Sequence, residues 1–137
     1  MTEVVVYESP KVAICSTGDE LVDMTSMDLG SGKIYDSNKP FMESFIRSLN
    51  YDLVLSEHIG DTLESMVAFL KKAMVSGAHL VMSSGAVSMG SYDFVKPALQ
   101  MIGAEIIFHK VAQKPGRPLL FAILPNGSLY FGLPGNP

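Results

Sequence analysis

Residues 80–94, LVMSSGAVSMGSYDF, constrain the fold of this chain more than any other stretch. Three apolar residues lead into two serines, the backbone then passes through Gly85 and Gly90, and Asp93 opens a segment with helical apolar periodicity. This order of strand, small-residue loop and helix is the repeating unit of α/β proteins. The chain is therefore expected to build a sheet whose strands are connected through helices.

The same loop has the properties of an anion-binding turn. Its glycines can expose backbone N–H groups, Ser84 and Ser88 add hydroxyl donors, and the following helix start carries partial positive charge. An ordinary β-to-α turn of small residues has the same composition, and the spacing matches neither the P-loop nor the dinucleotide fingerprint. The residues alone thus leave a phosphate site and a plain turn both open.

The rest of the chain continues the alternation of strands and helices. Strands are expected at residues 11–16, 51–59, 104–111, 119–124 and 129–133, a short extended piece at 34–38 and a loop at 23–33. Helices are expected at 40–49 and 93–102, and a third between Thr62, which caps it, and Gly77, which ends it. Asn126-Gly127 predicts a hairpin between the last two strands. The order favours an α/β fold with a mostly parallel sheet covered by helices on both faces.

Two local expectations can be checked directly. In the first helix Phe41, Phe45, Ile46 and Leu49 are expected to form one apolar stripe. Cys15, the single cysteine, cannot form an internal disulfide and is expected to be a small buried residue rather than a nucleophile.

Composition excludes several classes of protein. A chain of 137 residues is expected to form one domain, and 47% hydrophobic and 18% charged residues describe a compact core. No apolar run reaches the roughly 18 residues of a membrane helix, and the amino end lacks the shape of a signal peptide. A net charge of −4 argues against nonspecific nucleic-acid binding, and the three histidines show no metal-ligand spacing. A cytoplasmic protein without nucleic-acid or membrane partners is expected.

The loops that follow the strands point to one site. In parallel sheets, ligands bind outside the carboxyl ends of the strands. This rule brings Asp19, Glu20, Asp61, the loop from Ser84 to Asp93 and residues 132–137 to one rim. Solvated turn acids are the simpler explanation for Asp19 and Glu20 alone, but the convergence favours a ligand site. Because the chain stops where another helix could begin, the domain is expected to be cut from a longer chain, or to have that face covered otherwise.

Five stretches, in order, resemble the central catalytic domain of the MoeA family. They are residues 16–21 (STGDEL), 32–38 (GKIYDSN), 84–90 (SGAVSMG) with Asp93, 114–118 (KPGRP) and 132–137 (GLPGNP). The family comprises molybdopterin molybdenumtransferases and includes the gephyrin E domain. The resemblance implies a three-layer α/β/α fold of the molybdopterin-binding, MoaB/MogA-like type.

The resemblance also implies a chemistry and its residues. Molybdate would be inserted into adenylylated molybdopterin with loss of AMP in a Mg²⁺-dependent step. Glu20, Asp61 and Asp93 would lie around the metal and the oxyanion, as catalytic residues and metal ligands. Lys110 and Lys114 would also be catalytic residues and would bind anionic ligand. The ligand-binding residues implied are Thr17, Gly18, Asp19, Asp36, Asn38, Ser84, Gly85, Ser88, Gly90, Arg117, Pro134 and Pro137. Among them the serines would hold a pterin phosphate and the prolines would shape the molybdate pocket.

Family members carry further domains before and after this one, and a neighbouring subunit completes their site. The resemblance therefore implies missing partner domains and a homo-oligomer, dimer or trimer. Two other functions stay open: molybdopterin adenylyltransfer of the MogA/MoaB type, and a non-catalytic pterin-binding or self-association module. The sequence does not separate molybdenum from tungsten.

Overall fold

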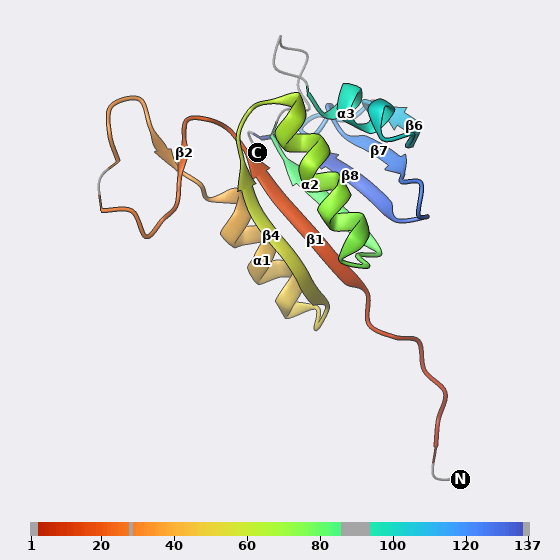
Figure 1. The fold of residues 1–137 in the computed structure, drawn as a ribbon. Coiled ribbons are helices and arrows are strands. Elements are labelled where there is room, and N and C mark those ends of the chain that lie inside the picture. Colours follow the sequence, from red (N-terminus) through yellow and green to blue (C-terminus); the bar gives the residue numbers. More distant parts are fainter. Residues whose placement is uncertain (1–2, 28, 86–93, 136–137) are drawn as a thin grey trace.

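A computed structural model describes residues 3–27, 29–85 and 94–135 of the chain. Its strands are β1 (Lys11–Thr17), β2 (Leu21–Val22), β3 (Ile34–Tyr35), β4 (Asp52–Ile59), β5 (Leu80–Ser84), β6 (Glu105–His109), β7 (Leu120–Ile123) and β8 (Leu129–Leu133). Its helices are α1 (Asn38–Ser48), α2 (Leu63–Val75) and α3 (Val95–Met101). The strands and helices form three layers, as Figure 1 shows, which confirms the predicted α/β/α fold.

Six strands form one sheet in the order β4-β1-β5-β8-β7-β6. β4, β1, β5 and β8 are parallel, and β7 is antiparallel to both of its neighbours. β6 therefore points the same way as the four parallel strands. The predicted Asn-Gly hairpin is confirmed between β7 and β8, where Gly127 has a φ of 86° and donates its N–H to the Leu124 carbonyl oxygen.

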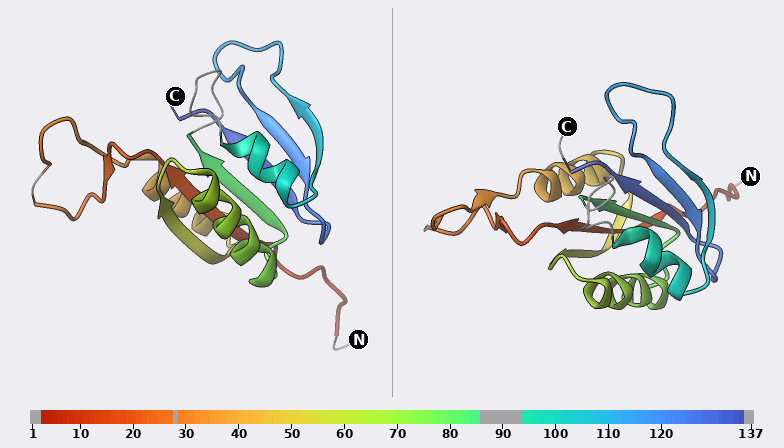
Figure 2. Two further views of the ribbon diagram at one scale, coloured as in Figure 1. Left: turned by 45° about the horizontal axis from the view of Figure 1, so that its top comes forward. Right: turned by 90° about the horizontal axis from the view of Figure 1, so that it is seen from above.

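Helix α1 covers one face of the sheet, and α2 and α3 cover the other (Figure 2). Because side chains alternate along a strand, β1 feeds both cores. Val12 and Ile14 pack with α1, whereas Ala13 and Cys15 pack with α2 and α3. Cys15 is fully buried, as predicted, and burial raises the pKa of its thiol well above the ordinary value.

The predicted stripe of α1 was right at Ile46 and wrong at Phe41, Phe45 and Leu49. The helix buries Met42 and Ile46, while Phe41 is 70% and Phe45 50% exposed. Successive helical residues are about 100° apart, so the two phenylalanines lie beside the buried face rather than on it. The helix also begins two residues before Pro40. Helix α2 behaves as predicted, since Thr62 accepts the N–H of Ser65 and caps its start.

Strand β2 was not predicted, and residues 23–27 and 29–33, between it and β3, project beyond the sheet (Figure 1). The two short strands pair in parallel, and Asp36 donates its N–H to the carbonyl oxygen of Val22. A two-residue strand is too short for apolar alternation to show in the sequence. This pairing returns the chain to the end of β1. No helix in the described ranges is long and apolar enough to cross a membrane.

Candidate functional site

The carboxyl ends of β1, β4, β5, β6 and β8 lie at one end of the sheet, because all five strands point the same way. Their loops form a rim with the composition predicted for a ligand site. The loop after β1 supplies Asp19 and Glu20, and the loop after β4 supplies Asp61. Gly85 directly follows β5, and Pro134 directly follows β8.

Three strand ends touch at Gly85. Its φ is +98°, and a Cβ placed there would lie 2.8 Å from the carbonyl oxygen of Thr17. A Cβ on Gly135 would lie 3.0 Å from the Cα of Gly85. Only glycine fits this conformation and this spacing. The hydroxyl oxygen of Thr17 is buried there and has no hydrogen-bond partner among the described residues.

Asp19 and Asp61 tie the loops after β1 and β4 together. The Asp19 N–H donates to Asp61 Oδ2, and the Asp61 N–H donates to Asp19 Oδ1, both at 3.1 Å. Lys33 Nζ donates to the Asp19 carbonyl oxygen at 2.6 Å. The prediction that these acids meet at one rim therefore holds for the two aspartates.

Whether a magnesium ion fits the rim depends on the carboxylates in the loops after β1 and β4. Within residues 3–27, 29–85 and 94–135 no group of three His, Cys, Asp or Glu side chains could hold a metal. Asp61 and the exposed Glu20 do follow adjacent strands. Mg²⁺ usually takes one or two protein carboxylates, with waters and ligand phosphates completing its shell. Both carboxylates are thus of the chemical type that Mg²⁺ binds, and the third predicted ligand, Asp93, lies outside the described residues.

A second cluster lies on the α1 side of the rim. Ser16 and Asp36 are buried, and Ser16 Oγ donates to Asp36 Oδ2. His58 Nδ1 is 3.2 Å from Ser16 Oγ, and Asp36 Oδ1 accepts the N–H of Lys39 at 3.1 Å. His58 was not among the predicted site residues. Only the parallel register that places Ser16 beside His58 reveals its position.

Next to this cluster, Asn38 reaches the end of β8. Its Nδ2 donates to the carbonyl oxygen of Gly135 at 2.8 Å. Asp36 and Asn38, both predicted from the resemblance, therefore lie near Gly85: Asp36 accepts the N–H of Lys39, the neighbour of Asn38, and Asn38 binds Gly135, whose backbone approaches Gly85 closely.

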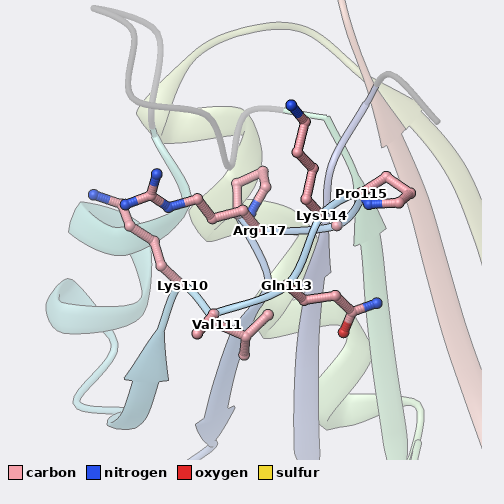
Figure 3. Close-up of a pocket in the computed structure, with 9 residues that line it drawn as sticks. Lys110, Val111, Gln113, Lys114, Pro115 and Arg117 are labelled. Carbon is pink, nitrogen blue, oxygen red and sulfur yellow. The ribbon is translucent and has the colours of Figure 1, made fainter.

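The loop after β6, residues 110–118, lines a pocket of about 900 Å³ that is open to the surface. Its base continues the β6–β7 ladder, since Lys110 donates its N–H to Leu119 and Val111 donates to Arg117. Three cationic side chains line the pocket: Lys110, Lys114 and Arg117. In Figure 3 the ends of Lys110 and Arg117 point to the same side of the loop, while Lys114 extends in another direction. A concentration of positive charge on an acidic protein suits an anionic ligand.

The structure thus sorts the predicted residues into three groups. The rim around Gly85 holds Thr17, Gly18, Asp19, Glu20, Asp61, Ser84 and Pro134, the adjacent path holds Asp36 and Asn38, and the cationic loop holds Lys110, Lys114 and Arg117. Ser88, Gly90, Asp93 and Pro137 lie outside the described residues.

A mostly parallel sheet, with its polar loops gathered at the carboxyl rim and cations beside it, defines an α/β domain with a rim suited to anionic ligands. The family model described as "Probable molybdopterin binding domain" matches residues 13–137. The chain belongs to this molybdopterin-binding domain family.

Curated relatives place it more closely. A molybdopterin molybdenumtransferase of Synechococcus elongatus is 39% identical over 138 residues, which cover 100% of this chain and 34% of the relative. One of Haemophilus influenzae is 40% identical over 138 residues, covering 100% of this chain and 33% of the relative. The chain therefore spans about a third of the length of the curated relatives it matches.

Solved structures agree with the fold. A molybdopterin biosynthesis MoeA protein from Pyrococcus horikosii superposes with a TM-score of 0.81 and 33% identity, covering 96% of this chain and 32% of that chain. MoaB from Pyrococcus furiosus, described as a tungsten cofactor synthesizing protein, gives a TM-score of 0.70 at 15% identity, covering 96% and 85%. The second likeness shows the fold alone. Together with the curated relatives, these findings confirm the resemblance to the MoeA family.

Proposed function

We propose that this domain binds a phosphorylated pterin of the molybdopterin type at its carboxyl rim, as a step in molybdenum cofactor biosynthesis. The observation that carries the proposal is the convergence of five strand ends on one rim that also holds a three-cation loop. Membership of the molybdopterin-binding domain family supports the identity of the ligand.

The cationic loop would hold the anionic part of the ligand. Arg117 can bind a phosphate through two parallel N–H donors, and the lysines add point charges. Ser84, the last residue of β5, and Gly85, which follows it, would lie beside a second anionic group of the ligand, and Thr17 fills the space next to Gly85. Pro134, at the end of β8, would shape the part of the pocket that receives molybdate.

In the full-length protein, the proposed reaction is insertion of molybdate into adenylylated molybdopterin, with release of AMP. The two sulfurs of the pterin dithiolene would supply the ligands of molybdenum, so no protein thiol is needed. Asp61 and Glu20, with Asp93, would hold Mg²⁺, which neutralises phosphate charge when it is bound. The relatives' further domains and a second subunit would complete the site.

The test is AMP release by the full-length protein from adenylylated molybdopterin on addition of molybdate and Mg²⁺. Lys114→Ala removes one charge-assisted contact, worth about 1.5–3 kcal/mol, and should weaken ligand binding about 10-fold to 100-fold. Lys71→Ala is the matched control, because Lys71 is an exposed lysine of α2 away from the loop.

Other results would assign a different function. Consumption of MgATP with free molybdopterin would point to adenylyltransfer instead. Tight binding without any product in either assay would leave a binding or self-association module. Equal affinities for the Lys114→Ala and Lys71→Ala proteins would contradict the role of the cationic loop.

A further inference from the structure

The cluster of Ser16, Asp36 and His58 contains a proton arrangement that can be worked out from its donors and acceptors. Ser16 is fully buried, Asp36 is nearly so, and the His58 side chain is 37% exposed. Both oxygens of Asp36 accept hydrogen bonds, one from Ser16 Oγ and one from the N–H of Lys39. A carboxylate in this position is an acceptor only.

The serine has a single hydroxyl proton, and it is used on Asp36. Ser16 Oγ can therefore offer only a lone pair to His58 Nδ1, 3.2 Å away. A contact between this lone pair and Nδ1 requires Nδ1 to carry a proton. Neutral His58 is thus expected to be the Nδ1–H tautomer, with Nε2 unprotonated.

His79 gives the opposite result at the other end of the sheet. Its Nδ1 accepts the backbone N–H of Lys11 at 3.2 Å, so Nδ1 must be unprotonated. Neutral His79 is expected to carry its proton on Nε2. The two histidines are therefore expected to have opposite tautomers. His58 lies at the carboxyl end of the parallel strands and His79 at the amino end, so each serves as a comparison for the other.

We propose that His58 is a positioning residue for the ligand rim: its Nδ1–H holds the Ser16 hydroxyl on Asp36, and Asp36 fixes the start of α1. The contacts continue from there to the rim. Lys39 and Asn38 lie in the first turn of α1, and the Asn38 side chain holds Gly135, which packs against Gly85. The functional part of this inference rests on the proposed pterin site, whereas the proton arrangement does not.

Loss of the imidazole donor would release the Ser16 hydroxyl, which could then rotate away from Asp36. Asp36 would lose its hydrogen bond from Ser16 as well as the contact of its Oδ2 with His58 Nδ1 at 4.0 Å, and its hold on the N–H of Lys39 would weaken. Displacement of Asn38 would then loosen Gly135 and the close contact at Gly85. The effect should reach the ligand without His58 touching it.

The first experiment is nitrogen NMR on the full chain with ¹⁵N-labelled histidine, at a pH where the imidazoles are neutral. His58→Asn and His79→Asn assign the signals. The expected result is a protonated Nδ1 for His58 and a protonated Nε2 for His79. A protonated Nε2 on neutral His58 would overturn the proton arrangement and, with it, the proposal.

The second experiment compares substitutions at the two histidines. His58→Asn keeps an N–H donor near the position of Nδ1, whereas His58→Phe keeps a ring and removes the donor. Loss of one hydrogen bond, about 1 kcal/mol, should weaken binding of adenylylated molybdopterin about fivefold in His58→Phe. His58→Asn and the control His79→Phe should bind like the parent chain. Equal binding by His58→Phe, or no rescue by Asn, would overturn the proposal.

A ligand-free measurement separates the two proposals. Amide hydrogen exchange at Lys39 should accelerate in His58→Phe but not in His58→Asn or His79→Phe. The comparison is made between proteins with the same midpoint of urea unfolding, so that a difference in global stability does not cause the effect. If exchange responds in this way and the parent chain binds no pterin, the proposed function fails and the positioning role stands. If pterin binds and Lys39 exchange is unchanged, the positioning role fails alone.

Discussion

One row of side chains crosses the whole sheet. Helix α1 covers one half of this row and leaves the other half open. Paired registers place Ser56, Ile14, Met82, Phe131, Phe121 and Phe108 side by side on the face that carries α1. Over β4, β1 and β5 this row lies under α1, and Ile14 is 0% exposed. On β7 and β6 no described helix covers the same face, and Phe108 is 36% exposed (Figure 2).

The difference shows that a side chain of this row is buried when a helix packs over it, and that an apolar residue type alone does not bury it. In the open half the aromatic rings cover one another, with ring centroids 5.6 Å apart for Phe108 and Phe121 and 4.8 Å for Phe121 and Phe131. Such contacts retain part of the burial that a helix would give. The opposite face is closed in both halves, since Ala13 of β1 and Leu120 of β7 are both fully buried on the side of α2 and α3.

The largest expected effect comes from removing one side chain from each half of the row. Ile14→Ala leaves a cavity under α1 and should lower the free energy of unfolding by about 2–5 kcal/mol. Phe121→Ala should cost less, about 1–2 kcal/mol, although phenylalanine is larger, because its ring is only half-buried. Urea unfolding of both proteins checks this order, and a cost for Phe121→Ala as large as that for Ile14→Ala would remove the distinction between the halves.

A smaller effect is expected at the join of the two halves, on the closed face. The hydroxyls of Ser83 in β5 and Tyr130 in β8 share a buried hydrogen bond. Tyr130→Phe or Ser83→Ala alone should cost about 1–3 kcal/mol, because the remaining hydroxyl loses a partner. The double variant should cost less than the sum, and strictly additive costs in this cycle would show that the pair does not couple the halves.

Alkaline pH should lower the stability of the protein, because burial raises the pKa of the Cys15 thiol in β1, a strand of the half covered by α1. The folded state keeps the thiol protonated, whereas the unfolded chain releases the proton above its ordinary pKa of about 8.5. Stability is therefore fully present below that pH and falls as pH rises towards the folded-state pKa, by up to about 1.4 kcal/mol per pH unit. Unfolding measured across this range should show a shallower loss for Cys15→Ala. The same loss in both proteins would contradict this assignment.

The smallest effect is expected for the surface ion pair between β4 and α2. Lys72 Nζ lies 2.8 Å from Glu57 Oε1, but the lysine side chain is more than half exposed. Glu57→Gln should change stability by about 0–1 kcal/mol and by less in high salt. A cost comparable to that of Ser83→Ala, measured in the same urea series, would mean that surface charge contributes as much to the covered half as buried contacts do.

Much of the fold followed from local patterns. Apolar runs located the six main strands, the Thr62 cap located α2, and Asn126-Gly127 located the hairpin. The rim was predictable too, because the direction of parallel strands fixes which loops meet. The face of α1 was not, since Phe41 and Met42 both recur at helical spacing and only packing decides between them.

The Ser16–Asp36–His58 cluster could not be predicted from the sequence, for a different reason. It depends on the register between β1 and β4 and on the pairing of β2 with β3, which brings Asp36 under β1. Neither pairing leaves a local pattern in the residues. Sites built from neighbouring strands are therefore harder to infer than sites built from one loop.

The reversed direction of β7 puts the β7–β8 turn at the far end of the molecule from the rim. Pro125, Asn126 and Gly127 are exposed there, whereas the Ser128 hydroxyl is held by the Ala78 carbonyl oxygen. A fluorophore or affinity tag inserted between Asn126 and Gly127 would stand clear of incoming ligand. The hairpin thus provides a handle for watching the domain at work without obstructing it.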